Sequence, residues 1–446
     1  MIADIWYACN AFCLWFNTFF AIPSTIIFFA VAVLLTIKTG FLQLRGLPRF
    51  LSLLSGGFSR KQEHDAKGRV TTISTFHALF AAMASTIGMG NVVGPSVAIM
   101  VGGPGALFWL LVYIFFGAAS KFTEVTFALY SRIETPRGII GGPMQYLKLV
   151  SPRLAFWYTS VMIFLFMSWS SLQSNTLASV LAFEGIDPLI VGVSLALVTL
   201  VVLSGGAKRV GDVASKLVPL MFVLYVVFSL GILLRDIEKL RYAIELVFRH
   251  AFTASAPLGG FAGATLLQAM QAGIYRSILI TEAGTGTSSI PHAMADTKSP
   301  VDQGLLAMFS MVSDAILSSL SGLMVLVTGV WLVGSFRSTL IYEAFKLNSS
   351  PLGNYVLLGS IALFVITTVI GNTFNGTQSF ASLTKSRWLK GYITVSALAM
   401  CAGALLPVQF MWNIMDVLMT LVVIPNLIGI VILAFKLPQV LRLTRS

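Results

Sequence analysis

Long apolar stretches joined by short polar connections run through the whole of this chain. A helix needs about 20 apolar residues to cross a bilayer, and stretches that can do so occupy residues 15–40, 74–100, 105–131, 154–183, 188–205, 214–234, 258–286, 303–333, 353–382, 391–406 and 411–436. We therefore predict an all-α membrane protein with about 11 transmembrane helices. Residues 1–446 are expected to form a single integral membrane domain.

The second apolar stretch is interrupted in its middle by the run STIGMGNVVG. Gly88 and Gly90 flank Met89, and Asn91 follows. Glycine in a helix interior costs about 1 kcal/mol relative to alanine, and a backbone amide in hydrocarbon needs an internal partner. Such a break persists where the freed groups face protein, water or a ligand, and in transporters they often form the binding site. We predict that residues 84–94 are the functional centre.

A second interruption lies in the apolar stretch 258–286, at Glu282, Gly284 and Gly286. Two broken helices in corresponding places are typical of an inverted repeat of five plus five helices. The fold class expected is therefore one N-terminal helix plus a 5+5 inverted-repeat core with two discontinuous helices. The predicted parts are an extra N-terminal helix with a basic cytoplasmic loop (1–69), a first repeat (70–240), a second repeat (250–436) and a cytoplasmic tail (437–446).

Composition agrees with this interpretation and gives the chain an orientation. The sequence is 57% hydrophobic and 10% charged, against about 25% charged residues in soluble domains. The net charge of +12 is uneven, because most basic residues fall in 45–69, 131–153, 208–216, 298, 385–390 and 436–445. The positive-inside rule then places the N-terminus outside and the C-terminus in the cytoplasm. The excess charge predicts topology, and no nucleic-acid partner is expected.

Other function classes find little support in the residues. Cys9, Cys13 and Cys401 show no metal or redox spacing. Paired catalytic carboxylates, a metal-ligand constellation and a nucleophile elbow are missing from the sequence, so we predict no enzyme and no cofactor. Two dissimilar glycine breaks fit a carrier better than a channel or a purely structural protein. Lys121 and Glu124 lie three apart on one helical face and are predicted to pair locally.

Several runs in this sequence resemble one family of membrane transporters. They are GFLQLRGLPR (40–49), FHALFAAMASTIGMGNVVG (76–94), GGPGALFW (102–109), ASKFTEVTFALYSR (119–132), GGPMQY (141–146), GGAKRVGDVASKLVP (205–219), EAGTGTSS (282–289) and DVLMTLVVIPN (416–426). In this order, over nearly the whole chain, they resemble the alanine/glycine:cation symporter family. The resemblance implies a leucine-transporter-like fold and sodium-coupled uptake of a small neutral amino acid across the bacterial inner membrane.

The first break is suited to holding the carboxylate of an amino acid. Unwound backbone at Gly88, Met89 and Gly90 offers amide donors, and the dipole of a half-helix favours an anion. Close helix packing through small residues is the structural alternative. The resemblance further implies that Gln173, in the polar run SWSSLQSN, reaches the substrate, whereas interhelical hydrogen bonding is the alternative.

A sodium site follows from the resemblance alone. The family's fold places one sodium between the first broken helix and the eighth helix of the core. The implied ligands are the carbonyls of Ala84 and Ile87 and the hydroxyls of Thr367 and Thr368. Alternatively, each hydroxyl bonds its own helix backbone one turn back.

Intramembrane charged and amide groups are candidates for coupling or gating. Glu282, Asp314 and Asp416 are acids within apolar stretches, where ionisable groups are costly and usually functional. They suit ion coupling, proton acceptance or a gate with Arg276. Asn91, the last residue of the first interruption, is a further coupling or gating candidate.

The chain departs from the family's pattern around the expected substrate side chain. Where the family has the run FSNEAG, this chain has Leu279 in place of the aromatic residue and Thr281 in place of the asparagine. Asn372 stands for a tryptophan, which opens volume and makes the wall of the site more polar. Leu279, Thr281 and Asn372 complete the predicted substrate-binding set. Alanine or glycine specificity is therefore open, and the alternative is a proton-coupled or exchange carrier for another amino acid or small zwitterion. The protein is expected to function as a monomer.

Overall fold

A computed structural model describes residues 2–55, 72–135, 138–255, 263–297, 299–333, 339–348 and 351–443. Its longer helices are α1 (Ile2–Lys38), α4 (Thr75–Thr86), α5 (Met89–Gly102), α6 (Gly105–Tyr130), α8 (Pro152–Ala182), α9 (Pro188–Leu203), α10 (Gly206–Leu233), α11 (Ile237–His250), α12 (Leu266–Thr281), α14 (Pro300–Thr328), α16 (Pro351–Thr384), α17 (Leu389–Leu405) and α18 (Val408–Lys436).

The remaining elements are short. They are α2 (Leu42–Arg45), α3 (Leu47–Ser55), α7 (Pro143–Tyr146), α13 (Ser289–His292), α15 (Leu340–Asn348), the 3-10 turns η1 (Leu147–Leu149), η2 (Val330–Val333) and η3 (Pro438–Leu441), and the antiparallel strands β1 (Ile133–Thr135) and β2 (Gly138–Ile140). This hairpin and the amphipathic helices α11 and α15 were not predicted from the sequence.

The helical membrane architecture is confirmed. Among the described residues, eight helices are long and apolar enough to cross a membrane, and α9 and α17 are shorter apolar helices. Every predicted apolar stretch overlaps a helix or a broken helix. Leu197, Val201 and Phe156 are more than half exposed at 58%, 64% and 65%, and large exposed apolar side chains of this kind suit a surface that faces lipid.

Some predicted boundaries were wrong. The first helix begins at Ile2 and not near residue 15, and α10 begins at Gly206, before its basic residues, and not at residue 214. Lys208 and Arg209 belong to the first turn of α10, because a helix tolerates charged side chains that reach solvent. Part of the seventh stretch lies outside the described residues; within them α12 begins at Leu266, because Thr265 and Gln268 form a capping box there.

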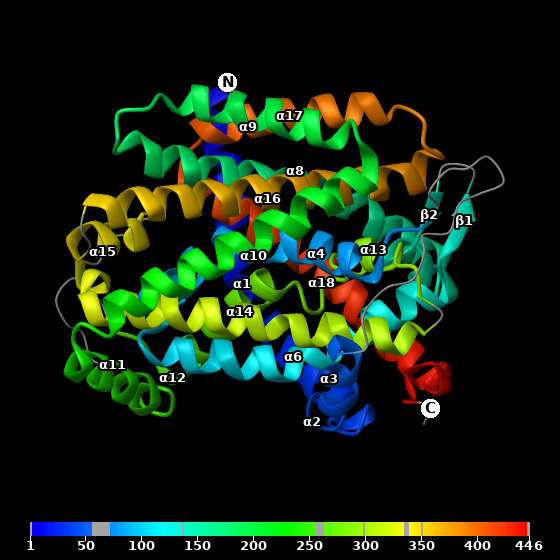
Figure 1. Ribbon diagram of the computed structural model, residues 1–446, viewed down its shortest axis with the longest axis horizontal. Coiled ribbons are helices and arrows are strands. Elements are labelled where there is room, and N and C mark those ends of the chain that lie inside the picture. The colour runs from blue at the N-terminus through cyan, green and yellow to red at the C-terminus, as the bar shows by residue number, and fades with distance from the viewer. Residues whose placement is uncertain are drawn as a thin grey trace.

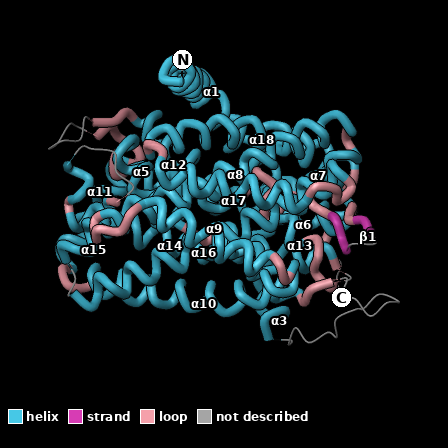
Figure 2. The backbone as a smooth tube through the Cα atoms, turned by 90° about the horizontal axis from the view of Figure 1, so that it is seen from above, coloured by secondary structure: helices cyan, strands magenta, loops and turns pink. Residues whose placement is uncertain are grey.

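The long helices lie roughly side by side, with both ends of the bundle capped by shorter elements (Figure 1). The hairpin, α3, α13 and the C-terminus lie at one end, and α11 and α15 lie at the other. Helix α8 packs against α9, α16 and α17, while α6 packs against α12 and α14. Helix α1 packs on α18 and α6 and crosses the bundle steeply, so that Figure 2 shows it nearly end-on at the edge.

Both predicted helix breaks are present. Helix α4 ends at Thr86 and α5 begins at Met89, so Ile87 and Gly88 separate them. Helix α12 ends at Thr281, and the next helical turn begins only at Ser289. The two breaks lie close together, because α12 packs against α5 along much of its length.

Candidate functional site

The first break is shaped by a close approach of two helices. A Cβ atom added at Gly88 would lie 2.1 Å from the hydroxyl oxygen of Thr368 in α16. Real Cβ atoms essentially never come within 3.0 Å of another heavy atom, so only glycine fits here. The site therefore places the bare backbone of Gly88 and the carbonyl group of Ile87 directly beside α16.

Asn91 closes the start of α5 and ties it to another helix. The Gly88 amide donates to Asn91 Oδ1 at 3.1 Å, and the Asn91 amide donates to the Gly88 carbonyl at 3.1 Å. The side-chain nitrogen of Asn91 donates to Asp314 Oδ1 at 2.9 Å. Gly90 and Asn91 thus belong to the first turn of α5, whereas the sequence interpretation counted them within the break.

The amides of Met89 and Gly90 occupy the first two positions of α5. A helix provides no internal acceptor for amides at these positions, and its dipole favours an anion there. Met89 is buried at 3% exposure. Gly90 faces α12, since an added Cβ would lie 3.8 Å from the Leu279 carbonyl oxygen. The predicted residues of the first break and Leu279 therefore come together.

The four expected sodium ligands are not equally placed. Thr368 Oγ1 lies 3.3 Å from the Ile87 carbonyl oxygen and 2.8 Å from the carbonyl of Phe364 in its own helix. Thr367 instead donates to Leu363 and Phe364 at 2.9 and 3.0 Å and lies 3.4 Å from the sulfur of Met221. Ala84 is buried in α4 at 1% exposure.

The second break is held by side chains from three other helices. Lys121 Nζ donates to the Thr281 carbonyl at 3.1 Å, and the Tyr113 hydroxyl donates to the Ala283 carbonyl at 3.1 Å. Asn426 donates to the Gly284 carbonyl at 2.9 Å, and Tyr158 donates to the Thr285 carbonyl. The linker's carbonyl groups are thus largely bound by the protein itself.

Buried acids surround this linker. Glu282 adopts a left-handed backbone conformation (φ 58°) and accepts a hydrogen bond from Thr287. Glu124 accepts a hydrogen bond from Asn426 at 2.7 Å, so its expected pairing with Lys121 gives way to a partner in α18. Glu282, Glu124 and Asp314 are fully buried, and each keeps one carboxyl oxygen without a partner within the described part of the chain.

Thr281 turns toward its own helix, because its hydroxyl donates to the Ser277 carbonyl at 2.8 Å. The same oxygen accepts the Ala283 amide at 3.2 Å. Its contacts therefore stabilise the end of α12. Substrate contact by Thr281, as expected from the sequence, remains a prediction.

Gln173 in α8 and Asn372 in α16 are buried, with 3% and 0% exposure. Gln173 Oε1 and both side-chain polar atoms of Asn372 find no hydrogen-bond partner among the residues described. Asn375, which the sequence analysis did not assign to the site, behaves in the same way at 1% exposure. Its spacing of three residues from Asn372 was the signal available in the sequence.

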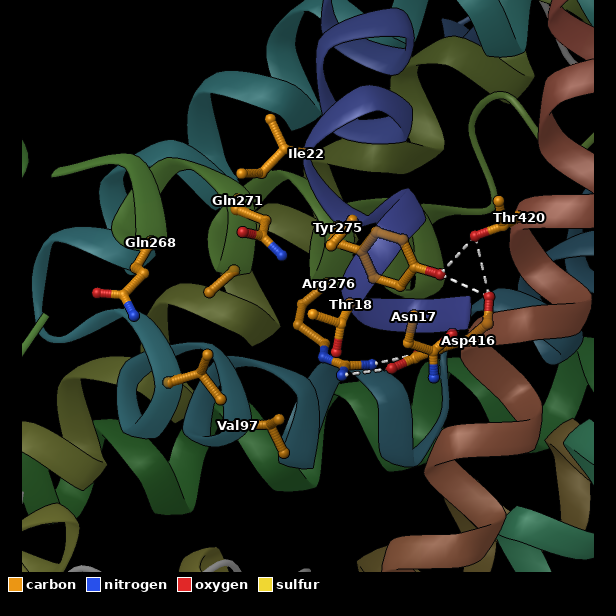
Figure 3. Close-up of a pocket in the computed structure, with 13 residues that line it drawn as sticks. Asn17, Thr18, Ile22, Val97, Gln268, Gln271, Tyr275, Arg276, Asp416 and Thr420 are labelled. Carbon is orange, nitrogen blue, oxygen red and sulfur yellow. Dashed lines mark hydrogen bonds and ion pairs between the residues drawn. The ribbon is translucent and has the colours of Figure 1, made fainter. Parts of the chain in front are cut away.

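Arg276 pairs with one of its predicted partners, Asp416 in α18. The guanidinium bonds both carboxylate oxygens at 2.8 and 2.9 Å, and Trp412 stacks over it at 4.8 Å. The pair lies in a cavity of about 460 Å³ between α1, α5, α12 and α18 (Figure 3). Tyr275 lines the same cavity and donates to the Asp416 carbonyl at 2.6 Å.

Comparison with known proteins gives consistent matches over the whole chain. A model of the sodium:alanine symporter family matches residues 7–444. The sodium/alanine symporter AgcS of Methanococcus maripaludis is 31% identical over 426 residues, covering 92% of this chain and 91% of that protein. The probable sodium/glutamine symporter GlnT of Bacillus subtilis is 31% identical over 420 residues, with coverage of 92% and 85%.

A solved structure shares the fold. The structure of MhsT in complex with L-phenylalanine matches with a TM-score of 0.62 at 14% identity, over 87% of this chain and 94% of that one. At this identity the likeness concerns the fold alone. It confirms the leucine-transporter-like arrangement expected from the sequence.

Proposed function

This chain belongs to the sodium:alanine symporter family, and we propose that it moves a small neutral amino acid together with sodium by alternating access. The protein is a multi-pass membrane transporter and not an enzyme. The observation that carries the proposal is the bare backbone at Gly88, which lies beside Thr368 and directly before the free end of α5. This geometry suits a carboxylate and a cation held on the same few residues.

The substrate site is built around the first break. The amides of Met89 and Gly90, next to Gly88, would hold the carboxylate at the positive end of α5. The remaining members of the proposed substrate site, which would surround the rest of the amino acid, are Gln173, Leu279, Thr281 and Asn372.

Sodium would lie on the other side of the same backbone. The carbonyls of Ala84 and Ile87 and the hydroxyls of Thr367 and Thr368 provide oxygen ligands, which hard cations prefer. Because Ile87 and Gly88 adjoin the carboxylate site, sodium would order the backbone that binds substrate. Each partner should then strengthen the binding of the other by the same factor.

We further propose that the protein lies in a bacterial inner membrane, with its N-terminus outside. Among the described residues, the hairpin and the C-terminal ends of α16 and α18 lie at one end of the bundle, and basic residues flank all three in the sequence, which supports a common cytoplasmic side (Figure 1). In that orientation the cavity beside Arg276 and Asp416 belongs to the outer half of the protein. This ion pair would then act as a gate. One chain contains the whole proposed pathway, so a monomer should suffice.

Proton coupling is the second candidate. The observation that favours it is the buried set of Glu124, Glu282 and Asp314, which faces a single lysine, Lys121. Three acids near one base can exchange a proton without leaving the membrane interior. Asn91 would connect this set to the first break through its hydrogen bond to Asp314.

Uptake by the purified protein in liposomes tests the proposal. An inward sodium gradient should drive accumulation of an amino acid, and an equal potassium gradient should not. Thr368→Val should raise the sodium concentration for half-maximal uptake about 10-fold, because it removes a ligand oxygen. Thr367→Val, its matched neighbour, should raise that concentration less, because its hydroxyl faces Met221. Accumulation that ignores sodium and grows with a proton gradient would instead favour the second candidate.

A further inference from the structure

Unpaired polar side chains gather between α8 and α16. Both amide atoms of Asn372 and of Asn375 lack a partner in the described part of the protein. On α8 the same holds for Gln173 Oε1 and for the hydroxyls of Ser170 and Ser174. All five side chains are at least 95% buried. Burying a polar group without a partner is costly, so a cluster of such groups indicates that another molecule provides the partners.

The packing of the two helices places these groups opposite one another. Helix α8 starts at the end that carries the hairpin and α16 starts at the end that carries α15, so they run in opposite directions (Figure 1). A Cβ added at Gly376 of α16 would lie 3.1 Å from the Cβ of Phe166 in α8. One turn away from this contact, Ser170 faces the level of Asn372.

The cluster adjoins the first break. Asn372 follows Thr368 by one helical turn on the same face of α16, and Thr368 contacts Gly88. On the α8 side, Ser170, Gln173 and Ser174 share one face by their spacing. The neighbouring face is already used, because Ser171 and Asn175 bond carbonyls of α17 and of the turn after it. The unpaired groups therefore lie next to the carboxylate site, along the contact between α8 and α16.

We propose that this cluster binds the side chain of the transported amino acid and that this side chain carries a carboxamide. The inference rests on the proposed function and names its substrate class. Two asparagine amides present donors and acceptors at once, and a carboxamide offers both in return. An apolar side chain would leave these groups unpaired. A carboxylate or ammonium side chain would lose its hydration beside neutral groups only, at a much larger cost.

Isosteric pairs of amino acids test this directly. Binding of L-asparagine, L-leucine, L-aspartate, L-glutamine, L-methionine, L-glutamate, L-serine and L-alanine to the purified full-length protein is measured by calorimetry in sodium and in potassium. We expect asparagine or glutamine to bind at least about 10-fold more tightly than its apolar isostere, leucine or methionine. The acidic isosteres should bind more weakly still.

Two variants localise the effect. Asn372→Leu and Asn375→Leu should each reduce the preference for the amide over its apolar isostere about 10-fold, because the ratio is measured within one variant. Asn413→Leu is the matched control: this asparagine of α18 bonds Asn10 of α1 and belongs to neither proposed site. The control should keep the preference of the unmodified protein.

The outcomes separate this inference from the proposed function. Sodium-dependent binding of alanine or serine that equals or exceeds that of both amides would leave the symporter proposal intact and overturn the carboxamide assignment. Equal binding of each amide and its apolar isostere would also overturn it. Failure of every amino acid to bind in sodium would overturn both proposals.

Discussion

The two helix breaks differ in how they accommodate backbone groups that have no partner within a helix. At the first, only Ile87 and Gly88 separate two helices, and the side chains that bond the break are those of Asn91 and Thr368. At the second, the chain leaves the helix from Glu282 to Ser288, and side chains from α6, α8 and α18 bind its carbonyl groups. The first break is narrow because Gly88 has no side chain, whereas the second is long and is held by several side chains from other helices.

This difference indicates which of the two breaks is free to bind a ligand. A backbone whose carbonyls are already bonded to lysine, tyrosine and asparagine side chains has little capacity left for a ligand. The first break, which lacks a side chain at Gly88 and lies next to a hydroxyl and the start of a helix, keeps that capacity. The first break is therefore the better ligand site, and the second positions the acids around Glu282.

The largest effect is expected from Gly88→Ala. The added methyl group would overlap Thr368, and the break would have to widen or α16 would have to move. Overpacking of this kind costs about 1–3 kcal/mol, so sodium-dependent uptake should fall at least about 10-fold. Gly231→Ala is the control, because an added Cβ there meets nothing within 4 Å. Normal uptake by Gly88→Ala would show that the first break is wider than its geometry indicates.

A smaller effect on transport but a clear effect on stability is expected from Asn426→Leu. This side chain is fully buried and bonds Glu124, Gly284 and the Tyr146 hydroxyl. Leucine would leave all three groups unpaired, which should lower the free energy of unfolding by about 2–3 kcal/mol. Thermal unfolding in detergent measures the change, with Asn413→Leu as a comparison in the same helix. An unchanged melting temperature would mean that the linker does not depend on its side-chain contacts.

Both breaks could be located from the sequence, because glycine within an apolar stretch is a local signal. Their partners could not. Asn426 and Glu124 are 302 residues apart, and the sequence shows only that each is polar in an apolar setting. Lys121 illustrates the error that follows: helical spacing suggested Glu124 as its partner, but tertiary packing brings its amine to the Thr281 carbonyl. Such contacts depend on how helices far apart in the sequence are aligned along one another, which the sequence alone does not show.

The sodium ligands show the same limit at closer range. Thr367 and Thr368 are adjacent and alike in sequence, yet only the hydroxyl of Thr368 contacts Ile87. Successive residues on a helix point about 100° apart, so two neighbours cannot face one partner equally. Asn375 was missed for a related reason, since its burial without a partner is a property of the packed pair α8 and α16.

The smallest effect is expected at a surface contact that neither break uses. Lys346 and Tyr342 donate to Glu184, which lowers the pKa of this carboxyl below its ordinary value of 4.5. A lowered pKa in the folded state stabilises the protein above the ordinary pKa, and the gain is lost as pH falls through the lowered value. Glu184→Gln should therefore reduce the melting temperature slightly at about pH 7 and progressively less below about pH 4. A reduction of the same size at both pH values would contradict an ionic origin.

The contact between Gly88 and Thr368 also restricts how this protein can diverge. Shortening Thr368 to alanine would still leave its Cβ about 3.1 Å from a side chain at position 88. A larger residue 88 therefore fits more easily after residue 368 has lost its hydroxyl, which is the group beside Ile87. Two positions 280 residues apart in the chain are thus tied, because enlarging residue 88 alone brings its side chain against the Thr368 hydroxyl.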